Sequence, residues 1–239
     1  MLEALVWGLL AGSSFLLGGL IALRWNVGNS VFLGAVTGLG AGALLSAVSY
    51  KLIAEAGRMA GGSGYVAAGL LGGAVAAALV TSSKLRGGKL SGPPRHDPSF
   101  WIVGLSVIAE AIIITGGLLG STGLSAAVLA AVFLCGFPES MADTGPLRSA
   151  GYTKSQVIGG WLSMMLLCGV ATAAFTGLLT PAPAVLVAFV LAFAGGGILT
   201  YVTVHMIPEG IKDAGAITGI TTAVGFGLSF SLIEILGGH

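Results

Sequence analysis

Charged side chains are scarce in this chain of 239 residues, which has ten Lys and Arg and nine Asp and Glu. They make up 8% of the sequence, whereas an average soluble domain carries roughly 25%. The mean hydropathy is +1.00, and apolar runs of roughly 20 residues are long enough to cross a bilayer as helices. The composition therefore predicts an integral membrane protein, and the net charge of +1 gives no reason to expect a nucleic-acid partner.

The chain also lacks a cysteine framework and a basic N-terminal region. Its two cysteines, Cys135 and Cys168, fall inside apolar segments, so they are packing residues or a soft metal ligand rather than a disulfide. The first residues, MLEALVWGLL, include an acid and no base. We therefore expect no cleavable signal peptide and a first apolar segment that stays in the protein.

Eight apolar segments can be delimited, and they predict an all-α membrane protein with eight transmembrane helices. They cover approximately residues 3–23, 31–55, 64–84, 100–119, 124–146, 156–179, 183–208 and 216–236. The connections are short except for 84–99, which is rich in Gly, Pro, Lys and Arg and which we expect to be a mobile cytoplasmic loop. Residues 1–239 then form a single transmembrane domain.

The basic residues predict the orientation of these helices. Eight of the ten lie in the first, third, fifth and seventh connections: Arg24; Lys84, Arg86, Lys89 and Arg95; Arg148 and Lys154; and Lys212. Because cytoplasmic loops are enriched in Lys and Arg, these connections are expected in the cytoplasm and both termini outside it. We expect the plasma (inner) membrane as the location.

An internal repeat relates the second and seventh segments. AGALLSAVSYKLIAEA (41–56) aligns without gaps with GGGILTYVTVHMIPEG (195–210), so that Lys51 matches His205 and Glu55 matches Glu209. The two segments are expected to cross the membrane in opposite directions. This is typical of inverted repeats, here segments 1–3 and 6–8 around a central pair, 4 and 5. Chance alignment of Gly- and Ala-rich segments is the alternative.

Glycine is abundant, with 41 residues. In lipid, glycine lets helix backbones approach closely. Faces such as Gly34/Gly38/Gly42 therefore predict close helix packing, either within the chain or in a homodimer.

Two carboxylates interrupt the central pair of segments. Glu110 lies in 100–119 and Glu139 in 124–146, each about halfway along. An acid at this depth costs on the order of 3 kcal/mol or more, so it needs a partner, a proton or a water-filled cavity. Antiparallel neighbours place both acids at similar depth. Two such carboxylates do not both ionise in a dry site, which predicts proton release when a cation binds.

Helical spacing adds three candidate ligands. Ser106 lies four residues before Glu110, and Cys135, Glu139 and Asp143 form a row with a spacing of four. Pro138 removes a helical hydrogen bond and frees a carbonyl. Carboxylates and a hydroxyl suit Mg²⁺, Mn²⁺ or Fe²⁺, and a thiolate shifts the preference toward Zn²⁺ or Cd²⁺.

Each candidate ligand also has a structural interpretation. A single membrane acid can be held in an interhelical hydrogen bond. Cys135 can be a packing residue, Ser106 can bond to a carbonyl of its own helix, and Asp143 can serve only the helix end.

At these residues the chain resembles the ZIP family of divalent-metal transporters. GFPESMADTGPLRSAGYTKSQ (136–156) is similar to the family's fifth-span motif, His-Asn-x-Pro-Glu-Gly followed by a short basic loop. The fourth-span motif reads SVIAEA (106–111). The resemblance implies that Glu110 and Glu139 bind metal midway through the membrane, and that zinc or a related ion moves inward as substrate, with no permanent cofactor.

The chain departs from the family pattern at several positions. The motif histidines become Ser106 and Cys135, the asparagines become Val107 and Gly136, and the first motif proline becomes Ala109. The sixth segment, GWLSMMLLCGVAT, contains no acid where the family has a glutamate. Members of the family often bind two metal ions at this site. The missing side chains argue against a full two-metal centre in this chain.

His205 and Glu209 form a secondary candidate pair. They read His-x-x-Pro-Glu-Gly, but segment order places them at the cytoplasmic end of the seventh segment. They either contact metal near the inner exit or cap and hydrogen-bond helices.

Other function classes have weaker support. GGSG (61–64) superficially resembles a nucleophile motif, but it lies in a connection, and no second acid positions His205, the only histidine near membrane depth. GGKL (87–90) lacks the rest of a P-loop, so we expect no enzyme activity. The main alternative is a non-transporting metal sensor or scaffold built on a degenerate transporter fold; transport of a small organic cation is a further one.

Overall fold

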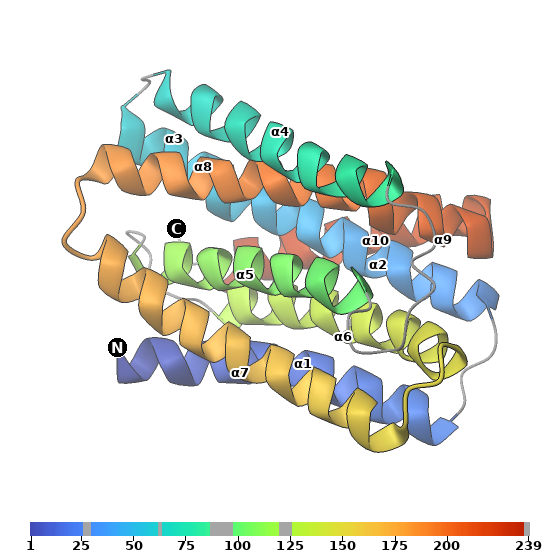
Figure 1. Cartoon of the computed structure of the whole chain (residues 1–239). Coiled ribbons are helices and arrows are strands. Elements are labelled where there is room, and N and C mark those ends of the chain that lie inside the picture. Colours follow the sequence, from blue (N-terminus) through green and yellow to red (C-terminus); the bar gives the residue numbers. More distant parts are fainter. Residues whose placement is uncertain (26–29, 62–63, 87–97, 120–125, 237–239) are drawn as a thin grey trace.

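The computed structural model of the chain describes residues 1–25, 30–61, 64–86, 98–119 and 126–236. All regular secondary structure in these ranges is helical. The helices are α1 (Leu2–Trp25), α2 (Ser30–Ala47), η1 (Val48–Ile53), α3 (Ala54–Ala60), α4 (Tyr65–Arg86), α5 (Pro98–Leu119), α6 (Ala126–Ser149), α7 (Lys154–Leu179), α8 (Ala184–Tyr201), η3 (Val202–Met206), α9 (Ile207–Ala214) and α10 (Ala216–Leu236). The long helices lie along one common axis and alternate in direction (Figure 1).

The length and hydropathy of the helices fit a membrane protein. Five stretches in the described part of the chain are long and apolar enough to cross a bilayer: Leu2–Arg24, Ser30–Ala60, Lys154–Leu179, Ala184–Ala214 and Ala216–Ile235. Two further apolar helices, Tyr65–Thr81 and Ser106–Leu119, are shorter. The prediction of a helical membrane protein is confirmed at this level.

The predicted segments and the observed helices correspond in order. Each of the eight segments matches one long helix or one run of consecutive helices, with ends that differ by a few residues. Most of the predicted loop 84–99 lies outside the described residues. Its first residues belong to α4, which ends at Arg86, and its last two belong to α5, which begins at Pro98. The starts of α1 and α8 and the ends of α2 and α7 share one end of the bundle (Figure 1).

Two of the long helical runs contain a π-helical turn. The η1 turn begins at Val48 and the η3 turn at Val202, which are matched positions in the alignment of 41–56 with 195–210. The wide η3 turn has a local cause, because the ring of Pro208 would clash with the carbonyl of Val204 in a regular α-helix. The η1 turn contains no proline, and the sequence carries no equivalent signal for it.

Glycines join α2 to α10 at backbone contact. A Cβ on Gly42 would overlap the backbone of Thr222, and a Cβ on Gly225 would overlap that of Leu39. Each helix therefore presents a glycine to the backbone of the other. The small-residue face predicted in 34–42 packs within the chain, on α9 and α10, while a homodimer stays a prediction.

The α4 and α8 helices are joined in the same way. A Cβ on Gly196 would overlap the backbone of Leu70, and a Cβ on Gly73 would overlap that of Phe193. Gly196 aligns with Gly42, and Phe193 matches Leu39 when the same alignment is extended by two residues toward the N-terminus. The pairs α2–α10 and α4–α8 therefore use matched contacts.

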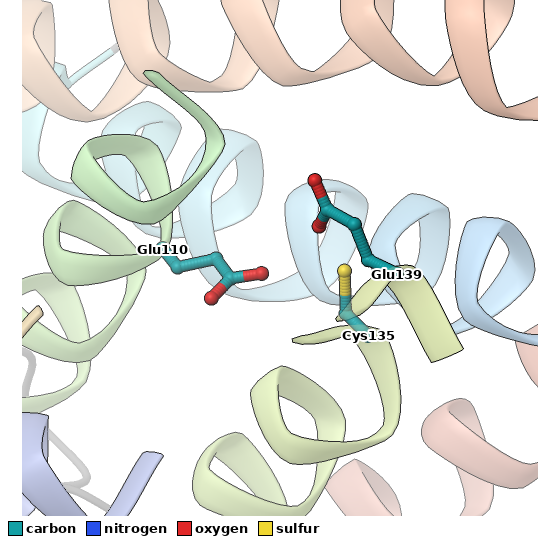
Figure 2. Close-up of side chains that lie close together, drawn as sticks. All are labelled: Glu110, Cys135 and Glu139. Atoms are coloured by element: carbon teal, nitrogen blue, oxygen red, sulfur yellow. The ribbon is translucent and has the colours of Figure 1, made fainter. Parts of the chain in front are cut away.

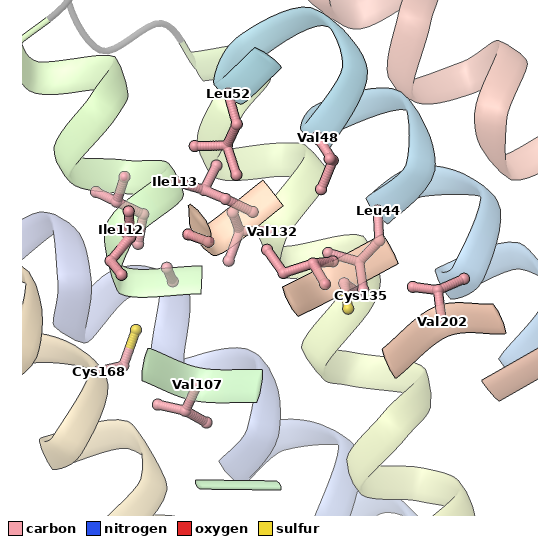
Figure 3. Close-up of a cluster of buried hydrophobic side chains, with 14 of the residues drawn as sticks. Leu44, Val48, Leu52, Val107, Ile112, Ile113, Val132, Cys135, Cys168 and Val202 are labelled. Atoms are coloured by element: carbon pink, nitrogen blue, oxygen red, sulfur yellow. The ribbon is translucent and has the colours of Figure 1, made fainter. Parts of the chain in front are cut away.

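The apolar core fills the space between these pairs. Its fully buried members come from α1, α2, η1, α3, α5, α6, α7, α8 and η3, and they include Leu44, Val48, Ile113, Val132 and Leu191. Cys135 lies among them, beside Leu44 and Val132 in Figure 3. The core thus surrounds the middle of α5 and α6, where the two acids of the central pair reside.

The helix contacts at glycine make a direct stability prediction. We expect Gly42→Ala and Gly196→Ala each to destabilise the protein by about 1–3 kcal/mol, because a methyl group there forces two backbones apart. Gly159→Ala is the matched control, since a Cβ at Gly159 meets no atom within 4 Å and alanine favours a helix. Thermal unfolding in detergent measures the differences, and an equal effect at all three positions would contradict the packing role.

Candidate metal centre

The central acids lie near the midpoints of two antiparallel helices. Glu110 is the thirteenth of the 22 residues of α5, and Glu139 is the fourteenth of the 24 residues of α6. The two helices run in opposite directions and lie beside each other (Figure 1). Matched depth follows from this arrangement, as the sequence predicts.

Glu110, Cys135 and Glu139 form a buried cluster, which we call the triad. One oxygen of each carboxylate and the Cys135 Sγ all lie within 4.8 Å of one another. The three side chains converge from the two helices: Glu110 points from α5 toward Cys135 and Glu139, which lie beside each other on α6 (Figure 2). All three are buried, at 1%, 0% and 5% exposure respectively, so a cation bound here would exchange water for these ligands.

Two hydroxyl groups hold one oxygen of Glu139. The Tyr201 hydroxyl donates to Oε1 at 2.6 Å, and Ser106 Oγ lies 3.0 Å from the same atom. The other oxygen, Oε2, has no hydrogen-bond partner among the described residues. This arrangement fixes the carboxylate through one oxygen and leaves the second available as a ligand.

Glu110 has no such support. Neither of its carboxylate oxygens has a hydrogen-bond partner in the described part of the chain. The ion pair found there, between Arg58 and Glu55, involves neither triad acid. A buried carboxylate without hydrogen bonds or an opposite charge is strongly disfavoured, so Glu110 needs a proton or a cation.

The helix around Glu139 is shaped by the preceding proline. Pro138 has no N–H, so the carbonyl of Leu134 lacks its usual helical donor. The α2 helix comes close because Gly40 has no side chain: a Cβ on it would lie 3.1 Å from Pro138 Cγ and 3.5 Å from the Leu134 oxygen. The glycine and proline thereby set α2 against α6 one residue from the triad.

Ser106 occupies a supporting position. Its hydroxyl is 2.8 Å from the carbonyl of Val103 as well as 3.0 Å from Glu139 Oε1. Its single O–H group is therefore shared between a carbonyl of its own helix, as the structural interpretation predicts, and the carboxylate of Glu139. Direct binding of metal by Ser106 stays a prediction.

Asp143, His205 and Glu209 lie apart from the triad. They line a second, polar cavity of about 420 Å³, together with Tyr201 and other residues of α6, η3 and α9. Asp143, four residues after Glu139, therefore lines the polar cavity and is not part of the triad. A metal-binding role for this set remains a prediction.

The residues that stand in place of the motif asparagines have packing roles. Val107 is fully buried in the apolar core. Gly136 leaves room for α1, since a Cβ on it would lie 2.5 Å from Ser14 Oγ and 2.9 Å from a ring carbon of Phe15. Cys168 is a free buried thiol and lies outside the triad. These positions therefore add no acid or imidazole to the cluster.

Sequence reasoning missed Tyr201. Its only visible signal is a phenol inside an apolar segment, because a buried tyrosine hydroxyl usually finds a hydrogen-bond partner. Spacing does not identify that partner, since Glu139 lies 62 residues away in the sequence.

Comparisons of the chain with models of known protein families and with curated proteins found no match. The resemblance to the ZIP family therefore rests on the motif residues and their arrangement.

The unequal support of the two acids predicts unequal effects of neutralising them. In metal-free buffer at neutral pH with a chelator, we expect Glu110→Gln to stabilise the protein by about 1–3 kcal/mol, because the uncharged amide avoids the cost of protonating or burying an unpaired carboxylate. Glu139→Gln should stabilise less or destabilise, because it weakens the hydrogen bonds from Ser106 and Tyr201. Thermal unfolding in detergent tests this, with Glu55→Gln as an acid outside the triad, and equal shifts for both triad variants would contradict the unequal support.

Proposed function

We propose that this protein carries a divalent transition-metal cation, zinc or a close relative, across the membrane toward the cytoplasm. The triad is the binding site in this proposal, and the protein alternates access to it without nucleotide hydrolysis. The observation that carries the proposal is the convergence of Glu110, Cys135 and Glu139 near the midpoints of α5 and α6, with three carboxylate oxygens that lack hydrogen-bond partners in the described residues.

The donor set favours borderline and soft cations. Two carboxylates and one thiolate combine hard and soft ligands, a mixture that suits Zn²⁺, Cd²⁺ or Co²⁺ better than Mg²⁺ or Ca²⁺. The thiolate and both carboxylates together carry three negative charges when ionised. A divalent cation offsets most of this charge, which is why the site is proposed to bind metal rather than a neutral solute.

The proposed architecture has eight spans in an inverted repeat around α5 and α6, with both termini outside. Three features support the repeat: the π-helical turns at Val48 and Val202, the matched glycine contacts of Gly42 and Gly196, and the opposite directions of α2 and α8 (Figure 1). Such repeats place the substrate at their interface near the bilayer midplane. Membership of the ZIP family is part of this proposal.

Uptake of metal into proteoliposomes tests the proposal. Native protein should accumulate one or more of Zn²⁺, Cd²⁺, Co²⁺, Mn²⁺ and Fe²⁺, and Glu110→Gln/Glu139→Gln should reduce uptake by more than about 100-fold. Loss of two ligands exceeds the roughly 10- to 100-fold effect of losing an outer-shell partner.

Glu55→Gln is the control for this experiment, because it removes an acid outside the triad and should keep native uptake. Equal uptake by the double variant would refute the site. A folded native protein that binds metal but moves none would instead favour the sensor or scaffold function.

The thiol of Cys135 should set metal preference. We expect Cys135→Ser to lower the affinity for Cd²⁺ relative to Mn²⁺ by at least about tenfold, because a hydroxyl is a harder and weaker ligand than a thiolate. Cys168→Ser is the matched control outside the triad. Competition binding by isothermal calorimetry measures the ratio, and an unchanged rank order would remove Cys135 from the site.

Metal binding should also release protons. The ligands must be deprotonated to bind, so the apparent affinity for Cd²⁺ should rise with pH. Calorimetric titration in two buffers of different ionisation enthalpy measures the number of protons released. A value of zero at neutral pH would mean that the empty triad is already fully ionised.

A further inference from the structure

Tyr201 lies between two cavities of opposite character. On one side is an apolar cavity of about 230 Å³ that reaches Ser106 and Glu110. On the other side is the polar cavity of about 420 Å³ that Asp143, His205 and Glu209 line. Tyr201 lines both of them and is the residue that the two linings share.

Two contacts hold the Tyr201 side chain, one through its hydroxyl and one through its ring. The hydroxyl donates to Glu139 Oε1 at 2.6 Å. The ring contacts that of His205, with centroids 5.5 Å apart and planes at 42°. Tyr201 is also the last residue of α8 before the π-helical η3 turn. Such turns are found frequently at functional sites.

The matched half of the chain has no counterpart of this contact. In the alignment of 41–56 with 195–210, Ala47 takes the place of Tyr201, and it is fully buried and apolar. Glu110, the matching acid on α5, correspondingly has no hydrogen-bond partner among the described residues. The hydrogen bond to Glu139 therefore makes the two sides of the triad unequal.

We propose that Tyr201 is the gate between the triad and the polar cavity, and that its hydroxyl keeps the gate closed by bonding to Glu139. This inference rests on the proposed function and adds the residue that controls release. A cation leaving the triad toward Asp143 and Glu209 must pass the phenol, so the Tyr201–Glu139 hydrogen bond has to break first. Tyr201 is thus a positioning residue for Glu139 as well as a barrier.

Cys135 provides a reporter for the gate that requires no transport. In a Cys168→Ala background it is the only cysteine of the chain, because the sequence has two. Its thiol is fully buried. A small water-soluble cationic reagent, 2-aminoethyl methanethiosulfonate, should modify it slowly in metal-free protein. The rate then measures how often the path from water to the triad opens.

Removing the hydroxyl should open this path. We expect Tyr201→Phe to raise the modification rate of Cys135 by on the order of tenfold, because hydrogen bonds to charged groups are among the stronger ones in proteins. Tyr201→Ala, which removes the ring as well, should raise it further. Tyr50→Phe and Tyr50→Ala are matched controls, since Tyr50 lies on η1 against Phe226 and Phe230 and should leave the rate unchanged.

Unchanged rates in both Tyr201 variants would overturn the gate, provided that the same thiol reacts fully after denaturation in detergent. Thermal unfolding establishes which variants are folded, and Tyr201→Phe, which preserves the ring, decides the question if Tyr201→Ala does not fold. Absence of metal uptake by the native protein would overturn the proposed function instead. The two failures are therefore distinguished by different measurements on the same samples.

Discussion

Burying Glu110 and Glu139 in an apolar bundle costs several kcal/mol for each charge, and no ion pair among the described residues offsets that cost. The surrounding structure responds to this constraint in several ways. The acids lie on facing helices with a thiol close to both, so one cation could neutralise both. One acid is also held by two hydroxyl groups. A purely structural pair of acids would be expected to use up its hydrogen-bonding capacity, and this pair leaves three oxygens available.

The glycine contacts explain how such a site can be held in place without polar scaffolding. Lipid offers little hydrophobic drive for one helix to pack on another, so close backbone contact has to supply the attraction. Gly42 and Gly196 bring α10 and α4 to backbone contact with α2 and α8. These two pairs flank the central helices α5 and α6, and Gly40 sets α2 against Pro138. The triad is therefore positioned by packing of small residues.

The most informative departure from symmetry is at Tyr201. Two halves with matched π-helical turns and matched glycine contacts would be expected to treat the two acids alike. A phenol in one half and the methyl group of Ala47 in the other remove that equivalence at the triad itself. Since Tyr201 also lines the polar cavity, the residue that orients Glu139 is also the one that we propose closes one route to it. Support of a ligand and closure of a path are thus linked by a single hydrogen bond.

Much of this could be anticipated from the sequence, because the relevant signals are local or periodic. Apolar length predicts the helices, the scarcity of charge predicts the membrane, and the positions of Glu110 and Glu139 along their segments predict matched depth. The spacing of four between Cys135 and Glu139 correctly places the thiol beside the acid. The same spacing placed Asp143 in the cluster, whereas the structure has it in the polar cavity, because a row along a helix extends about 6 Å per step and soon leaves a compact site.

The sequence by itself thus determined the helical class, the apolar surroundings and the identity of the candidate ligands, because composition and helical periodicity are properties of the chain. Only the tertiary structure decided which oxygens are free, that Ser106 and Tyr201 hold Glu139 and not Glu110, and that Tyr201 lines both cavities. The physical reason is that hydrogen bonds between helices and the walls of a cavity depend on how distant segments pack. The 62 residues that separate Tyr201 from Glu139 carry no local signal of their contact.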